Sequence, residues 1–358
     1  MKKLLVVLMA LLFTTGAFAQ STGAKFDYNL FGLAYGAMGS YGSDLKYDYQ
    51  HIRVVPMFTA GNENIKGVVQ FQIDMNYGAD ESPILARQTD KTKVKQAYLA
   101  ANDVFMQGLG FTTGLVAYAY PLIADIEGAV TAVSFDFGMG TANLYYLKIN
   151  EGAELTKNVA KQDDDVQAYI LDVTIKTGGI DVRPAFIYAS AGKQYGDLAK
   201  LAAYIGAVNA TGDMGMFDFD VTAAFMSAKT DKNLASTYID GSAYAFDLGV
   251  NVKPDTSMAI GVFGTYTSGT EGKKAKEFGF NQAINGLFGG AEGVPAGRLF
   301  ILQQGGTQDA GGFYPTGLEY ADRTNMYGNM AFGLSFTYTM DKLTLFAQYG
   351  YMMYAKKY

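Results

Sequence analysis

The stretch from residue 326 to residue 353 alternates between two kinds of side chain, and this pattern limits what the chain can fold into. From Met326 to Met340 the even-numbered positions are apolar or glycine, while most odd-numbered positions are small or polar. After a tight turn at 340–342 the alternation resumes and continues to Met353. A period of two indicates extended strands rather than a helix.

The length of these two strands favours a membrane over a soluble β-sandwich. Strands of soluble proteins have a mode near 5–6 residues, whereas a strand tilted across a bilayer needs about 9–11. Aromatic residues near the strand ends, such as Tyr338 and Tyr351, also fit the girdles of transmembrane barrels. The C-terminal hairpin therefore predicts two membrane-spanning strands.

The first residues have the three parts of a secretory signal peptide. Lys2 and Lys3 form the basic region, 4–13 the apolar region, and Ala17-Phe18-Ala19 a small-x-small cleavage motif. We therefore expect residues 1–19 to be removed and residues 20–358 to form one outer-membrane β-barrel. No linker rich in Pro or Ser divides this mature part.

Composition excludes several functional classes. The formal net charge is −6 with the signal peptide and −8 once Lys2 and Lys3 are removed, which is unfavourable for binding nucleic acid. The chain has no Cys and one His, so neither a disulfide framework nor a His-based metal site is expected. His51 has no suitably placed Ser for a catalytic triad, and the 163–165 Asp run lacks calcium-loop spacing. We predict no enzyme activity, no cofactor and no metal.

The same alternation recurs along the whole mature chain. We predict strands at 26–38, 50–60, 65–77, 93–102, 109–118, 129–137, 141–149, 166–177, 179–190, 201–208, 215–229, 241–253, 257–268, 326–340 and 342–355. Short turns alternate with long loops, among them 39–49, 119–128 and the very long 269–325, as in outer-membrane barrels with periplasmic turns.

The fold expected from these strands is an all-β transmembrane antiparallel β-barrel of about 16 strands. Closure removes sheet edges, which cannot be satisfied in hydrocarbon. Because such bacterial barrels have even strand numbers, fifteen visible strands leave two alternatives. One C-terminal strand is missing, or an element has been split or overlooked, with 14 strands as an alternative count.

Several short segments resemble the porin superfamily, most closely the homotrimeric outer-membrane porins of sulfate-reducing bacteria. The resemblance rests on 95–99 (KQAYL), 203–206 (AYIG) followed by 217–220 (FDFD), and 341–345 (DKLTL) with 349–351 (YGY). It implies a Gram-negative outer-membrane homotrimer of sixteen-stranded diffusion channels, each with a loop folded inward as a constriction.

Strand parity predicts which charged side chains line the pore. If the apolar set of each strand faces lipid, the other set faces the lumen, and a barrel of sixteen strands leaves an aqueous channel. The predicted pore-lining residues are Arg53, Asp74, Asp136, Asp172, Lys176, Asp181, Arg183, Asp218, Asp220, Asp247 and Lys253. Seven acids against four bases predict a weak cation preference.

The predicted function is therefore an outer-membrane porin for passive diffusion of small hydrophilic solutes and ions. Its expected surroundings are the lipid bilayer and lipopolysaccharide, with no nucleic-acid partner. The alternatives are a structural or adhesive barrel and a substrate-specific uptake channel. An uptake channel needs an aromatic ladder along the lumen, and Tyr and Phe fall mostly on the outward parity.

Overall fold

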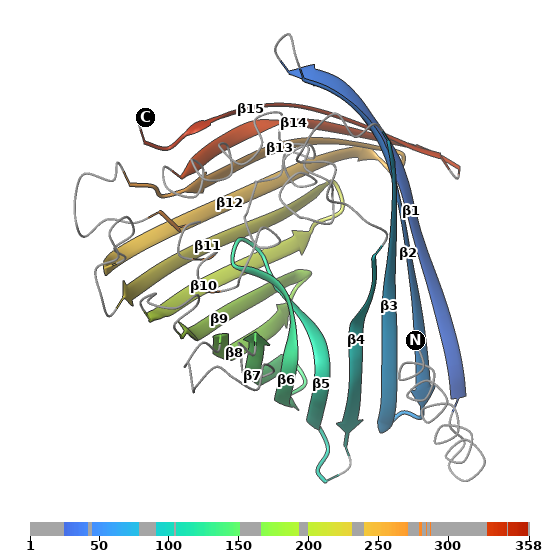
Figure 1. Cartoon of the computed structure of the whole chain (residues 1–358), viewed down its shortest axis with the longest axis vertical. Helices are drawn as coiled ribbons and strands as arrows, with labels where there is room; N and C mark the ends of the chain where they lie inside the picture. Colours follow the sequence, from blue (N-terminus) through green and yellow to red (C-terminus); the bar gives the residue numbers. More distant parts are fainter. Residues whose placement is uncertain are drawn as a thin grey trace, which may run out of the picture. The chain divides into compact units, whose positions relative to one another are not determined.

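The computed structural model is an antiparallel sheet of fifteen strands (Figure 1). It describes residues 25–41, 45–78, 91–103, 105–150, 166–192, 200–230, 240–270, 279–280, 284, 287, 328–341 and 343–356. The strands are β1 (Lys25–Tyr41), β2 (Leu45–Gly61), β3 (Ile65–Gly78), β4 (Lys91–Asn102), β5 (Leu109–Tyr120), β6 (Ala124–Asp136), β7 (Gly140–Asn150), β8 (Val166–Thr177), β9 (Ile180–Ala191), β10 (Leu201–Asp213), β11 (Phe217–Thr230), β12 (Asp240–Asp255), β13 (Met258–Thr267), β14 (Asn329–Met340) and β15 (Leu343–Tyr354). Their order in the sheet is their order in the sequence, which confirms the predicted all-β fold.

The chain divides into two compact units. One holds residues up to Ala117 together with Ala129–Asp136, and the other holds Tyr118–Gly128 together with everything from Phe137 onward. The tip of the β5–β6 hairpin therefore belongs to a different unit from its stem. The second unit, with β7–β15, contains the candidate site.

Side chains of β8–β13 alternate between a covered and a bare face. On β8, Ala168, Ile170 and Asp172 are buried, while Tyr169 and Leu171 between them are about half exposed. The same alternation runs along β9 to β13, and cross-strand register keeps residues of one kind opposite one another. We call these two sides the covered face and the bare face of the sheet.

The bare face carries a row of tyrosines across four strands, which we call the aromatic row. Tyr146, Tyr169, Tyr188 and Tyr204 are direct register partners from β7 to β10. Their ring centroids lie 5.2, 6.4 and 5.0 Å apart in sequence order. Cross-strand aromatic pairs of this kind stabilise a sheet and fix its register.

A glycine on β10 makes room for an aromatic ring on the next strand. A Cβ atom built at Gly212 would lie 2.5 Å from the Phe219 ring of β11. Gly212 is the register partner of Phe219. The ring therefore packs over backbone that no other residue type would leave open.

Two predicted long loops are wrong. Most of 39–49 lies in β1 and β2, and most of 119–128 lies in β5 and β6, which are joined by 121–123 alone. Leu122 has a φ of 64°, so the chain reverses through a left-handed residue instead of a loop. The alternation of apolar with other residues continues through both stretches, but polar and glycine residues at apolar positions make it difficult to recognise in the sequence.

Other sequence-based expectations fall outside the described residues. These are the signal peptide 1–19, the Asp run 163–165 and most of 269–325. No helix among the described residues is long and apolar enough to cross a membrane.

Candidate functional site

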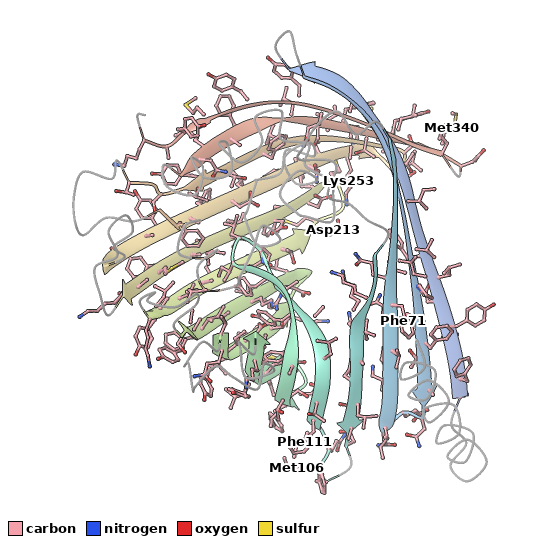
Figure 2. The ribbon with its side chains drawn as sticks, in the orientation of Figure 1. Phe71, Met106, Phe111, Asp213, Lys253 and Met340 are labelled. Carbon is pink, nitrogen blue, oxygen red and sulfur yellow. The ribbon has the colours of Figure 1, made fainter. Side chains whose placement is uncertain are left out.

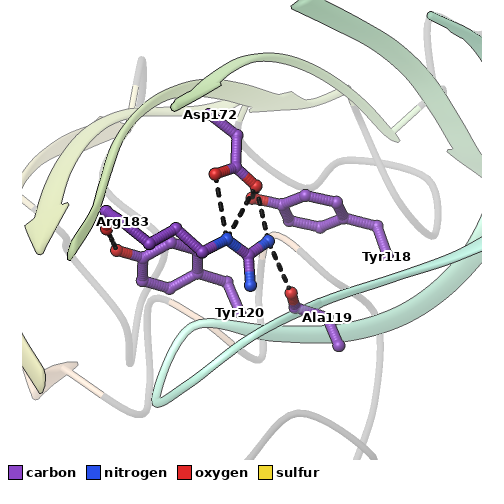
Figure 3. A network of polar contacts seen from close by, with 5 residues as sticks. All are labelled: Tyr118, Ala119, Tyr120, Asp172 and Arg183. Carbon is purple, nitrogen blue, oxygen red and sulfur yellow. Dashed lines mark hydrogen bonds and ion pairs between the residues drawn. The ribbon is translucent and has the colours of Figure 1, made fainter. Parts of the chain in front are cut away.

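An ion pair between adjacent strands is the centre of the candidate site (Figure 3). Asp172 of β8 and Arg183 of β9 both project from the covered face. The Arg183 Nε donates to the two carboxylate oxygens of Asp172 at 2.9 and 3.0 Å, and Nη2 forms the ion pair with Oδ2. The side chains are 2% exposed for Asp172 and 29% exposed for Arg183. A forked, largely buried contact of this kind is among the stronger ones that a protein makes.

The tip of the β5–β6 hairpin folds over this ion pair. In the sheet, β6, β7 and β8 separate β5 from β9. Nevertheless, Arg183 Nη2 donates to the carbonyl oxygen of Ala119 at 3.1 Å, and the Tyr120 hydroxyl donates to the carbonyl oxygen of Arg183. The end of β5 therefore leaves its place in the sheet and crosses the covered face to reach β9.

Aromatic rings enclose the guanidinium group. The Arg183 Cζ lies 4.7 Å from the ring centroid of Tyr120 and 5.9 Å from that of Tyr118, both within the range of cation–π contacts. The two tyrosines are 1% and 4% exposed, and the Tyr118 ring also packs against Tyr145 of β7 at 5.3 Å. The guanidinium is thus held from three sides by β5, β8 and β9.

The hydrogen bonds of the guanidinium group to described residues involve two of its three nitrogens. Nε and Nη2 make all the hydrogen bonds of the Arg183 side chain to described residues, and Nη1 makes none. The Arg183 side chain as a whole is 29% exposed. Arg183 therefore anchors the hairpin tip and stays partly accessible to solvent.

A second polar cluster lies at the ends of β10–β12 near their short turns (Figure 2). Lys253 Nζ lies 2.9 Å from carboxylate oxygens of both Asp213 and Asp218. The Asn251 amide also donates to Asp218. One lysine thus bridges two carboxylates, which leaves this cluster with a net negative charge.

Further polar side chains lie on the covered face of β10–β13. The Asn209 amide donates to Asp220 at 2.7 Å and to the Thr222 hydroxyl at 2.9 Å. The buried carboxylate of Asp247 accepts a hydrogen bond from Thr265. The covered face is polar in this half of the strands.

The eight predicted residues that belong to the second unit share the parity of this covered face. Asp172, Arg183, Asp218, Asp220, Asp247 and Lys253 take part in the contacts described above. Lys176 and Asp181, which are register partners, follow on the same parity. These eight residues lie along β8–β12 on one parity, and that they line a pore stays a prediction.

The remaining predicted residues belong to the first unit. Asp136 is exposed at the end of β6. Arg53 and Asp74 are register partners on β2 and β3, and their side chains are outside the described set, as is that of His51. These positions stay predictions.

The sequence did not reveal the hairpin residues Tyr118, Ala119 and Tyr120. The sequence predicts a strand that ends at Tyr118 and a loop from Ala119, and it predicts tyrosines mostly on the outward parity. Alternation of Tyr118 and Tyr120 with alanine was the available signal that β5 continues to Tyr120. No pattern in the sequence shows that these rings cross to β9.

The covered face is polar along only part of the strands, and its role as the wall of a pore stays a prediction. Towards the ends that lead to long connections, the covered face consists of aliphatic residues such as Ile170, Ile187 and Ile205, all fully buried. Within the described ranges, no group of three or more Asp, Glu or His side chains is arranged to hold a metal ion.

Comparison with known proteins identifies the fold through solved structures alone. No family model matches the chain, and no curated protein matches it in sequence. Its structure is similar to the outer membrane channel DcaP of Acinetobacter baumannii, with a TM-score of 0.50 and 10% identity over 92% of this chain and 91% of the other. It is also similar to OccK2 (OpdF) of Pseudomonas aeruginosa, with a TM-score of 0.50, 8% identity and coverage of 91% and 80%. A third similar structure is OccAB4 of A. baumannii, with a TM-score of 0.50, 10% identity and coverage of 92% and 82%. At such identities the likeness shows the fold alone, that of an antiparallel β-barrel.

Proposed function

We propose that this chain is an outer-membrane porin through which small hydrophilic solutes and ions diffuse passively. The observation that carries the proposal is the β5–β6 tip, fixed by Arg183 and Asp172 on the covered face of a sheet whose other face is bare and apolar. A bare apolar face can contact the lipid of a bilayer. A polypeptide segment held against the opposite face can narrow a water-filled channel on that side of the sheet.

The bare face supports insertion in a bilayer. Strands β7–β11 are 11 to 14 residues long, which meets the length needed for a tilted transmembrane strand. Large apolar side chains such as Leu171 and Phe186 are about half exposed there, with the aromatic row beside them. We place the protein in the outer membrane, exported by the signal peptide 1–19, with lipid and lipopolysaccharide around it.

The polar half of the covered face supports passage of hydrophilic solutes. Asp172 with Arg183 and Asp218 with Lys253 are ion pairs, so each pair adds little net field at a distance. Among the predicted pore-lining residues outside these pairs, five are acids and two are bases. A weak cation preference therefore remains the proposed selectivity.

The proposed assembly is a homotrimer, which the resemblance of the sequence to trimeric porins implies.

The second candidate function is a substrate-specific uptake channel. It is favoured by one observation, the Arg183 guanidinium that lies against two tyrosine rings and whose side chain is 29% exposed. Such a site can hold an anionic or planar group for longer than free diffusion allows.

Recording from the purified, refolded protein in planar bilayers tests the proposal. A porin gives stable conductance steps, grouped in threes for a trimer, and a reversal potential in a KCl gradient that indicates cations. Replacing Asp218, Asp220 and Asp247 together with Asn should move that potential toward anions. A β-rich, membrane-inserted protein that conducts no ions would refute the proposal, and saturable block by one solute would favour the uptake channel.

A further inference from the structure

Three short turns of the second unit expose methionine side chains. Met139 lies in the β6–β7 turn, Met214 and Met216 lie in the β10–β11 turn, and Met340 ends β14 at the β14–β15 turn. These four side chains are between 52% and 68% exposed. Turns that face water are normally built from Gly, Pro, Asn, Asp and Ser, so exposed thioethers at this end of the strands need a partner. We call these three connections the apolar turns.

Hydrogen bonds to the next strand fix the backbone of two apolar turns. The Met139 carbonyl oxygen accepts from the Lys176 N–H of β8 at 2.7 Å, and the Met216 carbonyl oxygen accepts from the Lys253 N–H of β12 at 2.7 Å. The turns therefore continue the sheet beyond the ends of their own strands. Their methionine side chains are exposed on an ordered frame.

The carboxylate beside Met214 is neutralised from the covered face. Asp213 accepts from Lys253 Nζ at 2.9 Å and from the Gly215 N–H at 2.9 Å. Lys253 also pairs with Asp218, whose parity is that of the covered face. A paired carboxylate is less costly to bring to an apolar boundary than a free one, so this turn can approach lipid.

The apolar turns lie about one membrane thickness from the aromatic row. Tyr204 of that row and Met214 are ten residues apart along β10. At ~3.4 Å per residue and a strand tilt of about 40°, ten residues rise ~26 Å across a membrane, close to the ~25 Å apolar band of outer-membrane barrels. The bare-face positions between them, 206, 208, 210 and 212, carry no charge. With the aromatic row at one membrane interface, the apolar turns therefore reach the other interface.

We propose that the apolar turns are immersed in the membrane interface, where their methionine side chains contact the headgroups and upper acyl chains of phospholipids. A flexible, polarizable thioether adapts to irregular surroundings, which suits a layer that is neither fully apolar nor aqueous. The connecting residues of the intervening turns, 178–179 and 256–257, are small or polar, so every second turn of this unit makes the contact. This inference rests on the proposed outer-membrane function and deepens it, because it identifies lipid as the partner of the turns.

Nitroxide labels on single cysteines test the depth of the turns, because the natural chain contains no Cys. Oxygen concentrates in lipid and a nickel chelate stays in water, so the ratio of their collisions with the label reports depth in phosphatidylcholine vesicles. Leu171→Cys marks the middle of the bare face. Lys176→Cys is the matched control, because Lys176 is exposed, has covered-face parity and is hydrogen-bonded to the Met139 turn.

The two apolar-turn labels, Met139→Cys and Met216→Cys, should give ratios between those of Leu171→Cys and Lys176→Cys. We expect them to exceed Lys176→Cys by about threefold or more, because an interfacial side chain lies about 5–10 Å into the boundary between headgroups and acyl chains. The label itself has the size of a large side chain, and both parent residues are exposed, so neither variant disturbs packing.

Two results would overturn the inference while Leu171→Cys remains in lipid. One is an apolar-turn ratio equal to that of Lys176→Cys, which would place the turns in water. The other is shielding from both oxygen and the nickel chelate, which would mean that the turns pack against protein, such as a second copy of the chain.

The same labels separate this inference from the proposed function. A Leu171→Cys ratio equal to that of Lys176→Cys would show that the bare face is not in lipid, and both would fail together. Labels in lipid at both turns of a protein that conducts no ions would refute the porin function and leave the interfacial turns intact. A conducting protein whose turn labels lie in water would do the reverse.

Discussion

Replacing Arg183 with Met tests whether the ion pair with Asp172 fixes the β5–β6 tip. The substitution removes the cation and its hydrogen bonds to Asp172 and Ala119, while the Asp172 carboxylate stays 2% exposed. Breaking a buried pair by removing one partner costs about 3–5 kcal/mol, since the remaining charge is left uncompensated. Because Arg183 is 29% exposed, we expect a value near the lower end.

The free energy of unfolding is measured by urea titration of the refolded protein in lipid vesicles, followed by far-UV circular dichroism. The matched control is Lys253→Met, which breaks a more exposed pair and should cost about 0–1 kcal/mol. Arg183→Lys keeps the charge but loses the forked geometry and should lie between the two. Asp172→Leu combined with Arg183→Met should recover much of the loss, because an apolar pair leaves no buried charge.

The same variant has an electrical signature. Without Arg183 the tip loses its bond through Ala119 and the cation–π contacts of both tyrosines. We expect larger current noise or a higher conductance in Arg183→Met, and neither in Lys253→Met. A loss below about 1 kcal/mol, the value for an exposed pair, together with unchanged current would show that other contacts hold the tip.

Three further substitutions test the two faces and the packing of the sheet. Leu334→Arg on the exposed side of β14 should lower the free energy of unfolding by about 2–4 kcal/mol near the bilayer midplane, whereas Ser335→Arg should be tolerated. Equal losses of this free energy in urea titrations of the two variants would show that the assigned faces of β14 are wrong. Lys253→Met removes the cation that bridges Asp213 and Asp218, so the reversal potential in a KCl gradient should move further toward cations, and a shift toward anions would contradict this. Gly212→Ala places a Cβ 2.5 Å from the Phe219 ring and should lower the free energy of unfolding by about 1–3 kcal/mol. Gly206→Ala, whose Cβ would have nothing within 4 Å, should leave it unchanged. Similar free energies for the two variants would exclude this packing.

Periodicity was sufficient to predict the strands and, in the second unit, the face of each charged residue. Asp172 and Arg183 on β8 and β9, and Asp218 and Lys253 on β11 and β12, lie on one face because side chains alternate along any strand. Register then aligns neighbouring strands without further information. These local rules predicted the fifteen strands, but not which charged residues pair with one another.

Local rules could not predict where a strand leaves its sheet. The hydrogen bond between Arg183 and Ala119 joins residues 64 positions apart, and nothing in the alternation of Tyr118 and Tyr120 distinguishes a tip that crosses the sheet from one that continues outward. The aliphatic part of the covered face could not be predicted for a different reason. Around Ile170 and Ile187 both parities are apolar, so the contrast that identifies an inner face disappears.

The aliphatic and polar parts of the covered face meet on β8 and β9. Asp172 lies two residues beyond Ile170 on β8, so the fixed hairpin tip and the aliphatic residues are neighbours on the covered face. Among the aliphatic residues, packing excludes water; beyond them, charged groups need water or each other. The boundary falls at Arg183, whose guanidinium satisfies a buried carboxylate while its side chain stays 29% exposed. In the porin that we propose, a solute that reached this boundary would meet a guanidinium already in place, because the contacts that orient Arg183 are made without the solute.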